Sequence, residues 1–210
     1  MSRRIDFDGL IAEARSLLER PGRHILAIAG APGSGKSTTV DRLARAFDLT
    51  HPGQVAILPM DGYHFDDAVL RQAGRLPRKG APDTFDVGGL ASTLSRLVAG
   101  TDTVAVPVFD RALEISRGSA RLIGPEARLI LCEGNYLLLD RGPWRDLAPF
   151  FDRTLMIEVP ENELKQRLTA RWRGYRLSPA DIRDKLEAND LPNGRTVRSA
   201  SRPADLVLTQ

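Results

Sequence analysis

The sequence has little cysteine and histidine and no long apolar run. It contains one cysteine, Cys132, and three histidines among 210 residues. A lone cysteine excludes an internal disulfide and a cysteine-rich metal site, and three scattered histidines do not make a metal site. No stretch reaches the ~18 apolar residues of a membrane span, and no apolar segment follows the N-terminal arginine pair. We therefore expect a cytoplasmic protein with no membrane partner.

An excess of one charge is also missing. The formal net charge is +3, and basic and acidic residues are nearly equal in number in each half of the chain. The chain has neither a basic arm nor the alternation of aromatic and basic residues that is typical of nucleic-acid-binding proteins, so we expect no nucleic-acid partner. Its 42% of hydrophobic residues can form the core of one globular domain, which we expect to span residues 1–210.

The most informative segment is a glycine-rich loop between a strand pattern and a helix pattern. Residues 30–37 read G-x-x-x-x-G-K-S. In such a loop the backbone N–H groups and the following helix N-terminus surround phosphates, the lysine reaches the β- and γ-phosphates, and the serine can bind Mg²⁺. Only four of the 30 basic residues are lysines, so a lysine at position 36 is informative. The expected nucleotide-binding residues are Gly30, Ala31, Pro32, Gly33, Ser34, Gly35, Lys36, Ser37 and Thr38.

Short apolar runs alternate with helical patterns along the chain, which is typical of an α/β fold. Continuous apolar strands in this fold class predict a parallel sheet with helices on both faces, and we expect five strands in its core. The apolar runs cover residues 24–30, 55–60, 104–108, 128–132, 154–159 and 205–208. The helical patterns cover residues 7–18, 38–47, 87–98, 144–150 and 162–172.

Two carboxylates directly follow predicted strands. Asp61 follows the run at residues 55–60, and Glu133 follows the run at residues 128–132. The carboxyl ends of parallel strands meet at one edge of a sheet, so both side chains are expected near the phosphate-binding loop. Asp61 can accept a proton from a hydroxyl group or bind the metal through water, and Glu133 can bind Mg²⁺ or an acceptor. Alternatively, each carboxylate caps the turn that follows it.

Residues 62–86 form the longest stretch without a clear periodic pattern. Loops of this length in compact domains are usually functional, and we expect this one to lie on the acceptor side of the phosphate site. The alternatives are packing roles for its aromatic residues and a solvated surface for its charges. A further arginine follows the run at residues 104–108. The candidate acceptor contacts from these segments are Tyr63, His64, Lys79, Asp86 and Arg111.

Arginines without acidic neighbours characterise residues 167–177. Arg167 and Arg171 share one helical face, and Gly174 offers a hinge. We expect this segment to be a mobile lid that closes on the transferred phosphate, the alternative being an ordinary exposed basic face. Ser178 followed by Pro179 predicts the start of the next helix.

At these residues the chain resembles the uridine kinase, phosphoribulokinase and bacterial-type pantothenate kinase group of P-loop kinases. The segments at residues 79–86 and 133–138 are similar to a branch of this group often labelled fructose-transport-system kinase. The resemblance implies a three-layer P-loop NTPase fold with an arginine-bearing lid, and ATP and Mg²⁺ as cofactors. It further implies Asp61 as catalytic base, Glu133 at the metal and acceptor, and Arg167 and Arg171 as phosphate contacts.

The resemblance also places two residues near the adenine, Asn193 and Arg202, and includes Tyr136 in the acceptor region. We expect Lys36 and Arg171 to act in catalysis with Asp61. The acceptor is expected to be a small molecule with a hydroxyl group, such as fructose, a nucleoside or a pantothenate-like compound. The alternative is a P-loop NTPase with a regulatory or chaperone-like role. A regulatory GTPase is disfavoured because the sequence has no N-K-x-D motif. Whether the protein forms a homodimer stays open.

Overall fold

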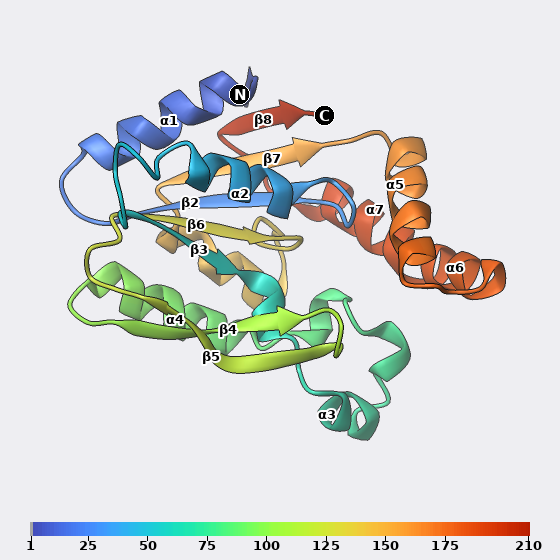
Figure 1. The fold of residues 1–210 in the computed structure, drawn as a ribbon. Helices are drawn as coiled ribbons and strands as arrows, with labels where there is room; N and C mark the ends of the chain where they lie inside the picture. The colour runs from blue at the N-terminus through green and yellow to red at the C-terminus, as the bar shows by residue number, and fades with distance from the viewer. Residues whose placement is uncertain (1) are drawn as a thin grey trace.

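A central parallel β-sheet organises the computed structural model, which describes residues 2–210 (Figure 1). The strand order is β1-β8-β7-β2-β6-β3. The strands are β1 (Arg3–Ile5), β2 (His24–Gly30), β3 (Val55–Pro59), β6 (Leu129–Gly134), β7 (Arg153–Glu158) and β8 (Leu206–Thr209). The α/β fold with a parallel sheet is confirmed, and the sheet is one strand wider than the expected five because the short β1 pairs with β8 at its edge.

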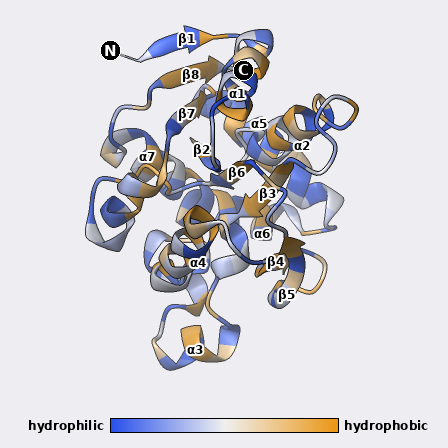
Figure 2. Ribbon diagram, turned by 90° about the vertical axis from the view of Figure 1, so that its left-hand side faces the viewer, coloured by the Kyte–Doolittle hydropathy of each residue, from blue (hydrophilic) through white to orange (hydrophobic). Residues whose placement is uncertain are grey.

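The strands are apolar on both sides, and helices therefore cover both faces of the sheet. In β2, Leu26 and Ile28 belong to the core on one face, whereas Ile25 and Ala27 belong to the core on the other. Figure 2 shows orange, hydrophobic strand segments between these helical layers. The first face is covered by α1 (Phe7–Glu19) and α2 (Lys36–Arg45), and the second by α4 (Val87–Ala99) and α7 (Leu191–Ala200). Cys132 is buried in the second core, as expected.

The apolar run at residues 104–108 forms a strand outside the main sheet, which corrects the simple alternating pattern. It is part of β4 (Val104–Asp110), which pairs antiparallel with β5 (Ile115–Ile123) in a separate two-stranded sheet. Val104 and Val106 are buried but Ala105 between them is exposed. This alternation is typical of a strand with one buried face. The number of apolar residues in a run does not distinguish such a strand from one that is buried on both faces.

Residues 62–86 contain regular structure where a long irregular loop was expected. Short 3₁₀ turns at residues 60–63, 76–78 and 82–84 flank α3 (Asp67–Gln72). Residues 142–150 likewise form a 3₁₀ helix instead of an α-helix. Its internal Pro149 has no N–H group to donate, which disfavours a regular α-helix.

The C-terminal part of the chain adds three helical elements beside the sheet. These are α5 (Glu161–Gly174), α6 (Pro179–Lys185) and a π-helical turn at residues 186–190 that leads into α7. The Ser178 hydroxyl accepts a hydrogen bond from the backbone N–H of Asp181, so the predicted helix start is confirmed. Within residues 2–210, no helix has both the length and the apolar character needed to cross a membrane.

Gly62 is the point at which the β4–β5 hairpin meets the loop after β3. A Cβ atom at Gly62 would overlap the backbone carbonyl of Pro107, and the atoms it meets are backbone atoms of β4, which leave little room to adjust. We expect Gly62→Ala to destabilise the protein by about 1–3 kcal/mol and to lower Tm by several degrees in a thermal unfolding scan. The control is Gly118→Ala, where the Cβ atom meets open space. Equal Tm values for the two variants would contradict this contact.

Candidate active site

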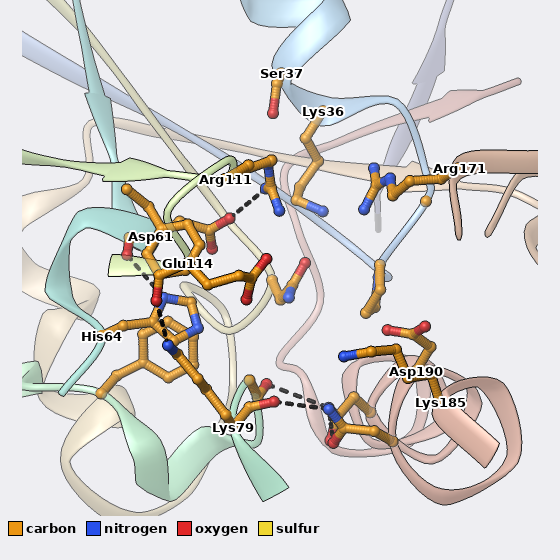
Figure 3. A pocket seen from close by; sticks show the side chains of 18 of the residues that line it. Lys36, Ser37, Asp61, His64, Lys79, Arg111, Glu114, Arg171, Lys185 and Asp190 are labelled. Atoms are coloured by element: carbon orange, nitrogen blue, oxygen red, sulfur yellow. Dashed lines mark hydrogen bonds and ion pairs between the residues drawn. The ribbon is translucent and has the colours of Figure 1, made fainter. Parts of the chain in front are cut away.

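A cavity of about 410 Å³ opens at the carboxyl ends of the central strands (Figure 3). The phosphate-binding loop, the residues after β3 and β6, the β4–β5 hairpin and the α5–α7 region all contribute to its wall. Ligands of open α/β sheets bind at this edge. Among the expected site residues, those that line the cavity are Pro32, Gly33, Gly35, Lys36, Ser37, Thr38, Asp61, His64, Lys79, Arg111, Glu133, Arg171 and Asn193.

The glycine-rich loop has the backbone conformation that a phosphate-binding loop requires. Gly33 and Gly35 have φ angles of +80° and +87°, which only glycine adopts without strain. Lys36 is buried, and its Nζ donates hydrogen bonds of 3.0 Å to the carbonyl oxygens of Gly30 and Ala31. Burial lowers the pKa of Lys36 to about 8, although the nearby Glu133 and Asp61 carboxylates act in the opposite direction. Anionic phosphates bound at this loop would raise the pKa of Lys36 again and so favour its protonated, charged form.

Ser37 and Glu133 come together from α2 and β6. The Ser37 hydroxyl donates a 3.1 Å hydrogen bond to Oε1 of Glu133. The pKa of Glu133 is raised, first by burial and then by the Asp61 carboxylate. Mg²⁺ prefers oxygen ligands and takes few of them from the protein when phosphates supply the rest, so this pair fits a Mg²⁺ ion beside a nucleotide. In residues 2–210, no cluster of three or more metal-binding His, Cys, Asp or Glu side chains occurs.

Asp61 lies across the cavity from the loop and forms an ion pair. Its Oδ2 accepts a 2.6 Å hydrogen bond from Arg111 at the tip of the β4–β5 hairpin (Figure 3). Burial raises the pKa of Asp61, but His64, Arg111 and Lys36 lower it more, and the pKa lies below its usual range. The His64 ring donates through Nδ1 to the Asp61 carbonyl oxygen at 2.7 Å, which leaves Nε2 as an acceptor while the ring is neutral.

An aromatic ledge forms the side of the cavity next to residues 62–86, where we expect the acceptor. The ring of His64 lies between Phe85 and Phe109, with centroid distances of 4.0 and 4.6 Å. Beside it, Lys79 donates hydrogen bonds to the Asp67 carboxylate at 2.6 Å and to the Glu114 carbonyl at 2.5 Å. The cations of this wall thus already have oxygen partners.

The opposite wall comes from the segment expected to act as a lid. Arg171 points into the cavity, near Lys36, and Asp190 and Lys185 lie below it (Figure 3). Trp172 donates a 2.7 Å hydrogen bond from Nε1 to Asp190, whose carboxylate is brought inward by the π-helical turn. Leu168 packs closely on Gly33, so α5 contacts the phosphate-binding loop directly.

Hydrogen bonds also join the lid side to the acceptor-side loop. Asn189 donates to the Lys79 carbonyl at 2.7 Å, and Asn193 donates to the Gly80 carbonyl at 3.2 Å. Tyr136 donates to the same Gly80 carbonyl at 2.6 Å from below. Tyr136 and Asn193 therefore hold the loop in place.

Several expected site residues lie elsewhere. Tyr63 and Tyr136 are buried outside the cavity lining, and Asp86 accepts a hydrogen bond from Gly89 N–H as the N-cap of α4. Arg167 forms an ion pair with Glu163 one turn earlier, which corrects the expectation of arginines without an acidic partner. Arg202 lines a second cavity, not the one that contains the phosphate-binding loop.

The sequence analysis also missed residues that line the cavity. Gly80, Phe85 and Asn135 lie in the segments that carry the family resemblance, but none was singled out as a site residue, and the others carry no motif. They come from several separate elements, so only the folded chain brings them together. Phe109 and Glu114 could have been suspected from their position around Arg111, and Trp172 from its place beside Arg171. The missed residues are Asp67, Leu76, Gly80, Phe85, Phe109, Glu114, Asn135, Trp172, Lys185, Asn189 and Asp190.

Comparison with known proteins gives matches along almost the whole chain. No family model matches. The Schizosaccharomyces pombe protein named "Putative uridine kinase C227.14" is 30% identical, over 97% of this chain and 90% of that protein. "Uncharacterized protein YggC" of Escherichia coli is 35% identical, over 89% of this chain and 77% of its own. Pantothenate kinases also match, but the chain spans only about half of their length, for example 46% of the Shouchella clausii enzyme.

A solved structure agrees with these matches. The crystal structure described as a "putative fructose transport system kinase" from Silicibacter sp. TM1040 has a TM-score of 0.88 and 40% sequence identity. The alignment covers 97% of this chain and 98% of that one. Phosphoribulokinase from Rhodobacter has a TM-score of 0.57 at 13% identity, which supports the shared fold alone.

The low pKa of Lys36 predicts that nucleotide binding takes up protons. With a pKa of about 8, Lys36 is half neutral at that pH, and the phosphates of ATP will return it to the charged form. Titration calorimetry at pH 8 in buffers of different ionisation enthalpy is expected to show an uptake of about half a proton. Lys36→Arg, whose guanidinium stays charged, is expected to bind more weakly and without this uptake. A binding heat that does not change with the buffer would contradict the prediction.

Proposed function

This chain belongs to the uridine kinase and pantothenate kinase group of P-loop kinases, and we propose that it phosphorylates an uncharged, sugar-like acceptor such as fructose. As a member of this group it is an ATP-dependent kinase of small molecules, with Mg²⁺ as the second cofactor. The acceptor proposal rests on one observation. Lys79 and Arg111, the cations beside the aromatic ledge, are already paired with the carboxylates of Asp67 and Asp61. A cytoplasmic location is part of the same proposal.

Asp61 is proposed as the general base. Phosphoryl transfer needs an acceptor hydroxyl held in line with the γ-phosphate and a group that takes its proton. The Asp61 carboxylate lies in the same cavity as Lys36 and Ser37, and its lowered pKa keeps it ionised at neutral pH. Arg111 orients this carboxylate through the 2.6 Å ion pair, and one carboxylate oxygen stays available for the acceptor.

Lys36 and Arg171 are proposed to neutralise the charge that develops on the transferred phosphoryl group. They approach the cavity from two sides, the loop and α5, which suits a phosphoryl group between them. Ser37 and Glu133 would hold Mg²⁺, which supplies charge neutralisation on the phosphate oxygens when bound. Arg167 is assigned to the outer side of the nucleotide, since its guanidinium lies near Gly35 and outside the cavity lining.

The acceptor wall favours a polyol over an anionic acceptor. Lys79 is bonded to Asp67 and to the Glu114 carbonyl, and Arg111 is bonded to Asp61, so an anionic acceptor would have to break an existing pair. The apolar face of a sugar ring could lie on Phe109, while its hydroxyls reach the surrounding carboxylates and amides.

The direct test is an acceptor panel. ATP consumption and product mass are measured with fructose, ribose, uridine, pantothenate and glycerate, for wild type and for Asp61→Asn. We expect a sugar to give the highest kcat/KM, and Asp61→Asn to lower kcat by about two to four orders of magnitude while ATP still binds. A preference for pantothenate or glycerate would reject the uncharged acceptor. ATP hydrolysis that no acceptor stimulates would favour a regulatory NTPase instead.

The Asp61–Arg111 pair predicts a shift in the pH profile. A base must be ionised to act, so kcat/KM falls as the pH drops through the pKa of Asp61. Arg111 lowers this pKa, and Arg111→Met is therefore expected to move the acid limb of the profile to higher pH. The matched control is Arg117→Met on the same hairpin. Arg117 is exposed, and it pairs with Asp110 at 3.5 Å and not with Asp61, so this variant removes a positive charge without changing the Asp61 ion pair. An acid limb that stays in place in Arg111→Met would argue against Asp61 as the base.

A further inference from the structure

The turn of the β4–β5 hairpin contains a backbone conformation that glycine ordinarily supplies. The two strands pair as far as Asp110 and Ile115, so residues 111–114 form the turn between them. Glu114, the last residue of this turn, has a φ angle of +55°. A side chain in this left-handed region crowds the backbone, and glycine or asparagine is usual at such positions. The turn accounts for the φ angle, but not for the presence of a glutamate.

Contacts from two sides hold the turn in this shape. The Asp110 carboxylate accepts hydrogen bonds from the backbone N–H groups of Ala112 and Leu113, at 3.0 and 3.1 Å. From the acceptor-side loop, Lys79 donates a 2.5 Å hydrogen bond to the Glu114 carbonyl oxygen. Strained residues persist where their surroundings fix them, and they are frequent at active sites and ligand clamps. The position of Glu114 is therefore set by both the hairpin and the loop.

The Glu114 side chain lines the active-site cavity and extends toward its centre (Figure 3). The other carboxylates on this side are already paired, Asp61 with Arg111 and Asp67 with Lys79. The Glu114 carboxylate, in contrast, forms no hydrogen bond and no ion pair within residues 2–210, since only its carbonyl oxygen has a partner. Both of its carboxylate oxygens are thus available to accept hydrogen bonds from a bound molecule.

An exposed glutamate at a hairpin tip is also what an ordinary protein surface contains, and Glu114 is exposed. Solvation would be served equally by an asparagine, which fits the turn with less strain. The same hairpin presents the ring of Phe109 to the cavity. An aromatic ring and a carboxylate without a partner together match a sugar, whose apolar face packs on the ring while its hydroxyls donate to the carboxylate.

We propose that Glu114 is a specificity-determining residue, which accepts hydrogen bonds from two neighbouring hydroxyls of the acceptor and repels acceptors that carry a carboxylate or a phosphate. This inference rests on the kinase activity and the uncharged acceptor proposed above. A diol satisfies both carboxylate oxygens, whereas an anion at the same place meets a charge of its own sign. Proton transfer stays with Asp61, so Glu114 acts on the KM of the acceptor and not on kcat.

The first test removes the charge of Glu114 and keeps the shape of its side chain. Steady-state kinetics are measured for wild type and Glu114→Gln with glycerate and with the uncharged acceptor of highest kcat/KM. We expect Glu114→Gln to raise the KM of the uncharged acceptor about tenfold or more, while kcat and the KM of ATP stay within about threefold. The kcat/KM for glycerate is expected to rise. The control is Asp83→Asn, because Asp83 is an exposed carboxylate outside the cavity lining that pairs with Arg75.

The outcomes separate this inference from the proposed function. Turnover of a sugar by wild type with an unchanged KM in Glu114→Gln would overturn the role of Glu114 alone. An anionic preferred acceptor, or no acceptor at all, would reject the proposed function and the role of Glu114 with it.

A second pair of variants distinguishes acceptor binding from an effect on folding. Ser119 has a φ angle of +54° on the same hairpin and lies outside the cavity lining. Glycine adopts this conformation freely, so neither Glu114→Gly nor Ser119→Gly is expected to lower Tm by more than about 1 °C. Only Glu114→Gly is expected to raise the KM of the acceptor. An equal rise in Ser119→Gly, or a wild-type KM in Glu114→Gly, would show that this carboxylate does not select the acceptor.

Discussion

The balance of charge around Lys36 is the constraint on which the candidate active site depends. A lysine that is 8% exposed is costly to bury in its charged form, and it is held by two backbone carbonyls with Glu133 and Asp61 nearby. Burial raises the pKa of Glu133, and the nearby Asp61 carboxylate raises it further. Phosphates and a metal ion bound at this site would satisfy both signs of charge at once.

The cavity wall proposed to hold the acceptor depends on a second constraint, namely hydrogen bonds between segments that are distant in sequence. Arg78 donates to the Ala188 carbonyl, and Asn189 donates to the Lys79 carbonyl. The acceptor-side loop is thus tied to the π-helical turn and not to the phosphate-binding loop. Closure over a nucleotide is therefore expected to involve α5 and Arg171, while the acceptor wall stays formed.

The β4–β5 hairpin extends the wall of the first cavity beyond the main sheet. It brings Phe109, Arg111 and Glu114 to the cavity from a separate two-stranded sheet. Gly62 permits the close approach, because any side chain there would meet the Pro107 carbonyl. Changes in the hairpin can alter the acceptor wall without disturbing the hydrogen bonds of the main sheet.

The sequence by itself determined the fold class, the phosphate-binding loop and the edge of the sheet where Asp61 and Glu133 meet. Local physics suffices for these: glycines permit the loop conformation, and strand polarity aligns the residues that follow β3 and β6. Only the tertiary structure decided that Asp86 caps a helix, that Arg167 pairs with Glu163, and that Arg202 lines a different cavity. Those outcomes depend on which elements pack together, and side-chain partners across elements leave no periodic signal in the chain.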